Sequence, residues 1–139
     1  MIARISDKEA RALLKECRTG RLGCIADGSP YVVPVNYILQ DDKIYVHSLV
    51  GQKVNALRQD SRACLQVDEI VDDYHWRSAI AFGRYREVTQ QAERDLVISE
   101  LLARFPFLTP VESVPVHDGG SSVVVFCIQI GRVSGVADS

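Results

Sequence analysis

The sequence lacks the segments that would carry it into or across a membrane. Its 139 residues contain no apolar run near the roughly 20 residues needed to span a bilayer, and the opening Met-Ile-Ala-Arg-Ile-Ser lacks the apolar core of a signal peptide. We therefore expect a cytoplasmic protein without a membrane partner. An excess of positive charge is also lacking, since 16 Lys and Arg against 18 Asp and Glu give a net charge of −2, which disfavours a nucleic-acid partner. Any phosphate that this protein binds must be held by a local cluster.

Cysteine and histidine are few, and neither is arranged as a metal site. The four cysteines include no Cys-x-x-Cys pair, and no two of the three histidines have helical ligand spacing. This pattern predicts reduced, mostly buried thiols and no bound metal. The residues concerned are Cys17, Cys24, Cys64 and Cys127, with His47, His75 and His117.

Length and composition fit one domain over residues 1–139, since 47% of the residues are hydrophobic and 24% are charged. Ser6 and Glu9 form a capping box, and the apolar spacing after them predicts a helix that ends at Gly20. Two more helices are predicted over residues 51–59 and 91–105. Their expected core positions are Val54 and Leu57 in the first, and Ile98, Leu101, Leu102 and Phe105 in the second.

Six segments have the alternation or the β-branched and aromatic content of strands. They are residues 22–26, 31–39, 43–48, 62–68, 76–88 and 122–133. Short connections predict antiparallel pairing, and closure into a barrel removes most exposed edges, so a mainly β, six-stranded antiparallel barrel with flanking helices is expected.

Three further segments interrupt or join these strands. Gly83 is expected to mark a bend or bulge, and residues 68–73 an acidic loop. The proline-rich residues 106–120 form either a lid or a plain surface loop.

The first candidate site lies where a strand passes into a helix, at His47, Ser48, Gly51, Gln52 and Lys53. A helix N-terminus offers unpaired N–H groups and positive potential, and a hydroxyl and an ammonium group would add donors for a phosphate dianion. A solvated turn with an exposed lysine has the same composition, so the pattern leaves both interpretations open.

Two further candidate sites lie on strands. Proline cannot donate to a sheet ladder, so Pro34 predicts an edge, a bulge, or a segment paired with something other than a strand, such as a flat heterocycle beside Asn36. Trp76 and Ser78 share one strand face while Arg77 lies on the other. A lone tryptophan at a strand start is more often a core or interface residue than a cofactor contact.

In their order along the chain, four motifs resemble one known family. Gly-Arg-Leu-Gly, Pro-Val-Asn-Tyr, His-Ser-x-x-Gly-x-Lys and Trp-x-Ser-x-x-x-x-Gly are similar to those of the pyridoxamine-phosphate-oxidase-like, FMN-binding split β-barrels. The nearest branch is the flavoproteins related to nitroimidazole-resistance proteins. The resemblance covers residues 6–90 well and the last strand, through Gly135, more weakly.

The resemblance implies a homodimer with FMN in clefts at the subunit interface. The segment along the isoalloxazine ring, contacting it through its backbone, would be Pro34, Val35, Asn36 and Tyr37. The residues that would hold the ribityl phosphate and the neighbouring ring edge are His47, Ser48, Gln52 and Lys53. Those that would come from the partner subunit are Trp76, Arg77 and Ser78. Family members often carry arginine where Gln52 stands, so Arg77 or Arg58 would have to supply that charge.

The function expected from the resemblance is an FMN-dependent oxidoreductase that passes electrons from reduced flavin to a small acceptor such as a nitro-aromatic compound. The vitamin B6 reaction is disfavoured, because the longer substrate-binding C-terminal region of the true oxidases has no counterpart here. His47 is the candidate proton donor, although shaping the flavin site would explain its position equally well. The alternatives are a non-catalytic flavin-binding or redox-sensing module, and a deazaflavin- or haem-binding relative on the same fold.

Overall fold

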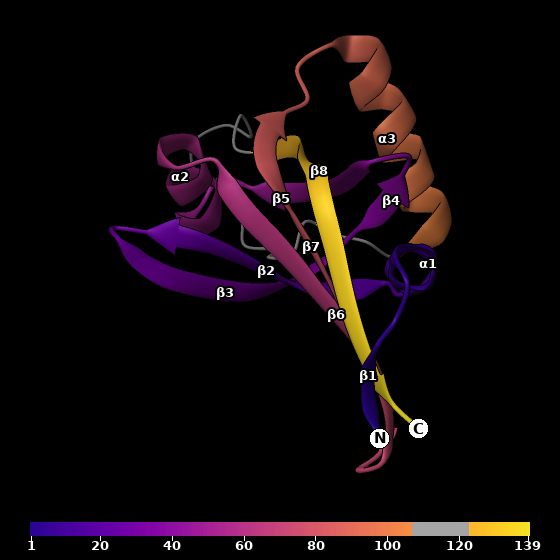
Figure 1. Cartoon of the computed structure of the whole chain (residues 1–139). Helices are drawn as coiled ribbons and strands as arrows, with labels where there is room; N and C mark the ends of the chain where they lie inside the picture. The colour runs from indigo at the N-terminus through magenta and orange to yellow at the C-terminus, as the bar shows by residue number, and fades with distance from the viewer. Residues whose placement is uncertain (107–122) are drawn as a thin grey trace.

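The computed structural model describes residues 1–106 and 123–139, so all but Pro106 of the proline-rich segment lies outside the described residues. Within them, three helices and eight strands follow one another along the chain (Figure 1). The elements are β1 (Ile2–Arg4), α1 (Asp7–Glu16), β2 (Thr19–Ala26), β3 (Ser29–Asn36), β4 (Ile38–Gln40), β5 (Lys43–Leu49), α2 (Gln52–Gln59), β6 (Arg62–Asp72), β7 (His75–Glu87), α3 (Gln91–Arg104) and β8 (Val123–Asp138).

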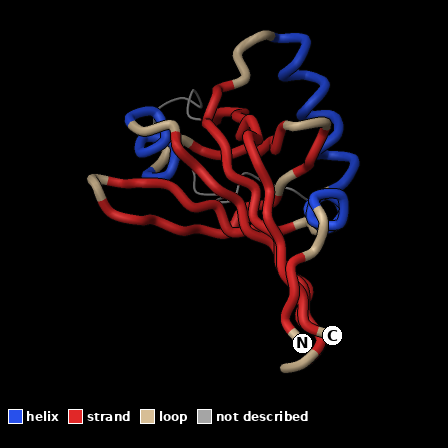
Figure 2. Tube along the Cα trace, in the orientation of Figure 1, coloured by secondary structure: helices blue, strands red, loops and turns tan. Residues whose placement is uncertain are grey.

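The described strands form one antiparallel sheet in the order β3-β2-β6-β7-β8-β5-β4, and β1 pairs with the end of β8. The register between β7 and β8 shifts at Phe82 and Gly83, which confirms the predicted bulge. A Cβ on Gly83 would lie only 2.1 Å from the carbonyl oxygen of Gln129, so no larger residue fits this crossing. The sheet curls around its core (Figure 2), and the expected split-barrel fold is confirmed.

Two apolar clusters hold the fold together. The larger lies inside the curled sheet, where Leu14 of α1 and Leu57 of α2 meet Leu22, Leu65 and Phe126 of the strands, all fully buried. The smaller lies between α3 and the opposite side of β5 and β8. Its members include Tyr45, Val97, Leu101 and Cys127.

All three predicted helices are present, but the end of the first and the buried face of the third differ from the prediction. Ser6 caps α1 as expected, accepting a hydrogen bond from the Glu9 amide at 3.1 Å, and Val54 and Leu57 are buried. The predicted end of the first helix at Gly20 is wrong. α1 stops at Glu16 because the Arg104 guanidinium donates to the carbonyl oxygens of Lys15, Glu16 and Cys17 at 2.8–3.2 Å. The apolar stripe of α3 is also shifted: Val97 is buried and Leu102 is exposed.

The strand predictions need three corrections. The structure has eight strands in its described part where six were expected. No strand was predicted at β1, and most of β4 was included in the strand predicted over residues 31–39. Residues 31–39 are not one strand, since the buried Tyr37 turns inward and its hydroxyl donates to the carbonyl oxygen of Leu14. The acidic residues 68–73 are not a loop: β6 continues to Asp72, pairing Ile70 with Trp76 and Asp72 with His75.

The long strands define a surface that we call the outer face, the side of the sheet opposite the larger apolar cluster. One row across it is Val32, Gly23, Cys64, Phe82 and Arg132, each paired with the next. Beyond the barrel, β1, the end of β8 and the β6–β7 hairpin continue together as an arm on which both chain ends lie (Figure 1). The Met1 ammonium group meets the Asp138 carboxylate there at 2.7 Å.

The described part of the chain contains no helix of the length and apolarity that a membrane span requires. All four cysteines are unpaired, with Cys24 and Cys127 buried and Cys17 and Cys64 half-buried.

Candidate functional site

The edge of the sheet at β3 carries the first predicted group. β3 is the last strand in the sheet order and pairs only with β2 among the described residues, which confirms the edge predicted from Pro34. Pro34 stands opposite Arg21 and has no N–H, so the backbone at this position faces away from β2. Backbone direction alternates along a strand, so the N–H and C=O of Asn36 face the same open edge. Its side-chain oxygen accepts from the Thr19 hydroxyl at 2.9 Å.

The side chains on either side of Asn36 are committed to the core. Val35 is 3% exposed and Tyr37 is fully buried, and burial raises the pKa of the Tyr37 hydroxyl. Only the backbone of this segment is therefore open to a ligand, which is the kind of contact expected for it.

At the end of β5, the side chains of His47 and Ser48 point to opposite sides of the sheet, because neighbouring residues of a strand face opposite sides. Ser48 is fully buried on the core side and donates to the Leu49 carbonyl oxygen at 2.9 Å. His47 is half-buried and faces α3, on the same side as the buried Tyr45, whose hydroxyl donates to Glu93 at 2.8 Å. Burial and the positive charge of Arg94 lower the pKa of His47, which favours its neutral form.

The N-terminus of α2 follows directly. Gly51 is its extended N-cap and, having no side chain, gives the first amides of α2 no N-cap hydrogen bond. Gln52 is exposed and Lys53 is half-buried. A cavity of about 380 Å³ lies between α2 and the β2–β3 turn and is lined by Gly51 and Gln52, with the carboxylate of Asp27 opposite. The positive helix end suits an anion in this cavity, whereas the carboxylate of Asp27 opposes one on that side.

The third predicted group lies on β7, away from the first two. Trp76 and Ser78 face outward, while Arg77 lies on the other side and pairs with Glu16 at 3.1 Å and Glu69 at 3.2 Å. Three strand spacings, about 14 Å, separate β7 from β3.

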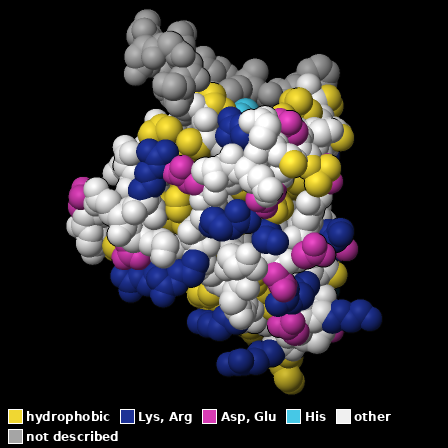
Figure 3. Space-filling model, turned by 90° about the horizontal axis from the view of Figure 1, so that it is seen from above, with side chains coloured by type: hydrophobic (Ala, Val, Ile, Leu, Met, Phe, Trp, Pro, Cys, Tyr) yellow, Lys and Arg dark blue, Asp and Glu magenta, His cyan; other side chains and the backbone are white. Residues whose placement is uncertain are grey.

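The two arginines expected to replace a missing phosphate charge already have partners. Arg77 binds the two carboxylates just given, and Arg58 pairs with Glu87. Figure 3 shows acidic and basic side chains interspersed over the face seen from above, without a broad basic patch. Within one chain, the first two groups adjoin where β3 contacts β5, and the third stands apart.

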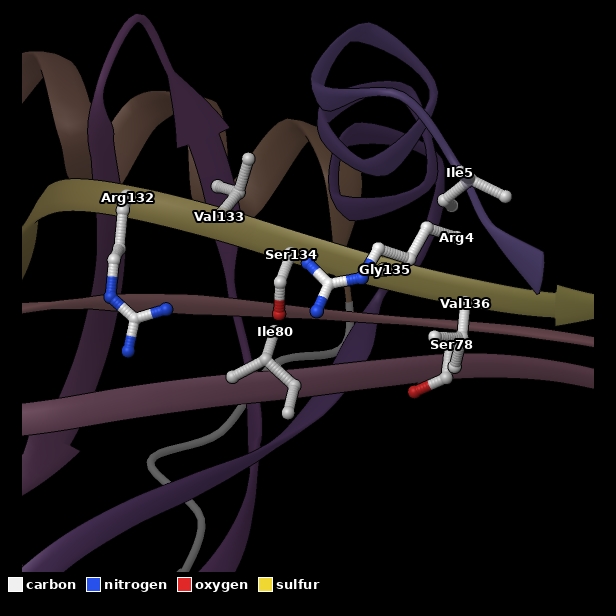
Figure 4. A pocket seen from close by; sticks show the side chains of 9 residues that line it. All are labelled: Arg4, Ile5, Ser78, Ile80, Arg132, Val133, Ser134, Gly135 and Val136. Atoms are coloured by element: carbon white, nitrogen blue, oxygen red, sulfur yellow. The ribbon is translucent and has the colours of Figure 1, made fainter.

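One feature escaped the sequence reasoning, a cavity of about 410 Å³ on the outer face beside Ser78 (Figure 4). Its polar side chains are Arg4, Ser78, Arg132 and Ser134. The alternation of Arg132 and Ser134 towards the end of the last strand was an available signal. Nothing local in the sequence indicates that Arg4 joins them, because β1 reaches β8 across the whole length of the chain.

Comparison with known proteins extends the motif resemblance over the chain. Residues 6–136 match the family described as pyridoxamine 5'-phosphate oxidase. An uncharacterised protein of Rhizobium meliloti (strain 1021) is 29% identical over 140 residues, covering 96% of this chain and 93% of its own.

Two solved structures share the fold. A FAD-binding protein from Mesorhizobium loti superposes with a TM-score of 0.87 at 31% identity, covering 100% of this chain and 99% of its own. A candidate 5-nitroimidazole antibiotic resistance protein from Bacteroides thetaiotaomicron superposes with a TM-score of 0.75 at 17% identity, covering 100% and 92%.

Proposed function

Because this chain belongs to the pyridoxamine 5'-phosphate oxidase family, we propose that it binds a flavin through an FMN moiety and transfers electrons from the reduced flavin to a small acceptor. The observation that carries the proposal is the family match over residues 6–136, joined to an open sheet edge at the segment expected to lie along the ring. The M. loti relative named for FAD binding supports a flavin as the ligand class.

The open edge of β3 supports the position of the isoalloxazine ring. Asn36 presents a backbone donor and acceptor at an edge where no described strand pairs, and a flat heterocycle with its own donors and acceptors matches that row. The buried side chains of Val35 and Tyr37 hold this backbone in place from the core side. The ring would thus replace the missing neighbouring strand.

The junction of β5 and α2 supports the position of the phosphate. The uncapped amides of α2 and the Lys53 ammonium group give two independent attractions for a dianion. In this proposal Lys53, in the first turn of α2, would supply a positive charge for the phosphate where Gln52 supplies none. In this proposal Ser48 lines the site without donating to the phosphate, because its hydroxyl already donates to the Leu49 carbonyl oxygen.

A homodimer with a flavin at each interface completes the proposal. The outer face exposes apolar side chains that a second copy would cover, since Ile2, Val32 and Ile70 are 62%, 63% and 68% exposed. Trp76 and Ser78 lie on this same face. A second subunit docked there would bring its Trp76 and Ser78 to the flavin of the first, which one chain alone cannot do.

When bound, the flavin supplies the electron chemistry, and the protein positions it and controls access. We propose that His47 shapes the site rather than donating a proton, because burial and Arg94 favour its neutral form. With flavin occupancy matched, His47→Gln should change single-turnover reoxidation by less than about threefold. A loss within the 10²- to 10⁴-fold range that is typical of general acids would instead identify a proton donor. A nitro-aromatic compound is the proposed acceptor class.

The absorption spectrum of the purified protein tests the cofactor first, because flavin, deazaflavin and haem absorb differently. Protein reconstituted with flavin is then assayed for oxidation of reduced nicotinamide with nitro-aromatic and other small acceptors. Flavin binding with turnover supports the oxidoreductase, and flavin binding without turnover leaves a binding or redox-sensing module. Failure to bind either FMN or FAD would refute the proposal.

A further inference from the structure

The cavity on the outer face is built as a site for an anion. Its volume of about 410 Å³ lies within the roughly 300–1,000 Å³ typical of small-molecule sites. Arg132 and Ser134 face it from β8, Ser78 faces it from β7, and Arg4 enters from β1. Figure 4 shows the Arg4 side chain extending along β8 towards Ser134, with the Arg132 guanidinium group further along the same strand.

Neither arginine is neutralised within the part of the chain that the structure describes. Among the described residues, no carboxylate lies within ion-pair distance of Arg4 or Arg132, although other arginines of this sheet, such as Arg21 and Arg77, do have acidic partners. The Arg132 guanidinium carbon lies 3.8 Å from the centre of the Phe82 ring, so the guanidinium group stacks on that ring while its N–H donors stay available.

The hydroxyl groups add donors between the two charges. Ser78 accepts a hydrogen bond from the Gln66 amide at 3.1 Å, and its own O–H has no acceptor within the described part of the chain. Ser134 is exposed and lies between Arg132 and Arg4 along β8. Two guanidinium groups and two hydroxyl groups match the acceptor oxygens of a phosphate ester.

The position of Arg4 depends on a glycine. A Cβ on Gly135 would lie 2.7 Å from the side chain of Ile5 and 2.9 Å from the Ser78 carbonyl oxygen. Without that side chain, the segment after β1 lies close against β8, where the Ile5 amide donates to the Gly135 carbonyl oxygen at 3.1 Å. Arg4 is thereby fixed opposite Val136, at the rim of the cavity.

We propose that this cavity binds the adenylate end of FAD, with Arg4 and Arg132 on its adenylate phosphate, so that the flavin of this protein is FAD rather than FMN. The inference rests on the proposed function. It follows from Ser78, which lines the cavity and belongs to the segment expected to approach the partner's flavin. In the proposed dimer, the cavity of one subunit therefore receives the far end of the flavin whose ring lies on the other subunit.

The test compares FAD with FMN on the dimeric protein, because only FAD reaches the cavity. Binding is followed by flavin fluorescence for wild type, for the double variant Arg4→Gln/Arg132→Gln, and for Ser134→Asp, which places a carboxylate between the arginines. Arg84→Gln is the matched control, since it removes one exposed positive charge of β7 outside the cavity. Light scattering and thermal unfolding verify that each variant stays dimeric and folded.

We expect wild type to bind FAD at least tenfold more tightly than FMN. The double variant and Ser134→Asp should each weaken FAD by about tenfold or more, since charge-assisted hydrogen bonds are lost, and leave FMN within about threefold. Equal binding of FMN and FAD by wild type, or an unchanged FAD to FMN ratio in both variants, overturns the inference and leaves flavin binding intact.

Two other outcomes separate this inference from its alternatives. If neither flavin binds to wild type, the proposed function itself fails, and the FAD site with it. If the double variant weakens reduced nicotinamide dinucleotide phosphate while the FAD to FMN ratio stays constant, the arginines hold the electron donor, and the FAD assignment is wrong.

Discussion

Lys53 offers the sharpest test of where the flavin phosphate lies. It stands in the first turn of α2, whose N-cap Gly51 has no side chain to bond the first amides. Lys53→Ala should therefore weaken FMN strongly and riboflavin hardly at all, because riboflavin has no phosphate. Alanine favours helix, so α2 itself should remain formed.

The size of the effect follows from the two attractions at this helix end. A hydrogen bond to a charged group contributes about 1.5–3 kcal/mol, which corresponds to a loss of roughly 10- to 150-fold in FMN affinity. The helix N-terminus adds about 0.3–1 kcal/mol and remains in the variant, so FMN should keep a small preference over riboflavin. Because Lys53 is half-buried, the lower part of the range is expected, and added salt should reduce the difference.

The assay is a fluorescence titration of both flavins against wild type, Lys53→Ala and Lys8→Ala. Lys8 is an exposed lysine of α1 and controls for the loss of one positive charge. Equal loss of FMN and riboflavin in Lys53→Ala, or equal FMN loss in both variants, would show that the phosphate is bound elsewhere.

Three further predictions concern stability and assembly. Arg104→Ala should lower the free energy of unfolding by about 1–3 kcal/mol in urea titrations, because the carbonyl groups at the end of α1 lose a charged donor, and an unchanged midpoint would contradict this. His47 has a lowered pKa in the folded protein, so the free energy of unfolding should fall as pH drops below about 6.5 and level off below the folded pKa. His47→Gln should lack that part of the pH dependence. Fluorescence of Trp76, the only tryptophan, should be quenched on flavin binding, and light scattering should give a dimer; a flavin-loaded monomer would exclude the shared site.

Much of the fold was predictable because its signals are local. The capping box at Ser6, the bulge at Gly83 and the edge strand at Pro34 each depend on one residue's backbone chemistry, and each is found where expected. The family and the split-barrel architecture, expected from the order of four short motifs, are confirmed by the match over residues 6–136.

The misses depend on partners distant in the sequence. β1 is a strand only because β8 pairs with it, and the acidic residues 68–72 are strand because β7 satisfies their backbone. α1 ends early because of Arg104, which lies on another helix. The same limit hid part of the outer cavity, since Arg4 joins Arg132 in its lining only through the pairing of β1 with β8.

The sequence indicates which residues belong to the candidate site more readily than it indicates what each of them does there. Alternation along β5 already implies that His47 and Ser48 face opposite sides, yet the motif groups them together. Burial decides which atoms remain available: the backbone at Asn36, but neither the side chain of Tyr37 nor the hydroxyl of Ser48. Their assignment to flavin remains a prediction.

The four thiols are buried to different extents, so their rates of alkylation can be used to follow dimerisation of the wild-type protein. Burial raises the pKa of Cys17, Cys24 and Cys127, which slows their reaction with alkylating reagents, because the thiolate is the reacting form. Cys64 lies half-buried on the outer face beside Phe82 and should be alkylated first. If a second copy covers that face, the alkylation rate of Cys64 will fall as protein concentration rises, and it will measure the dissociation constant without any added label.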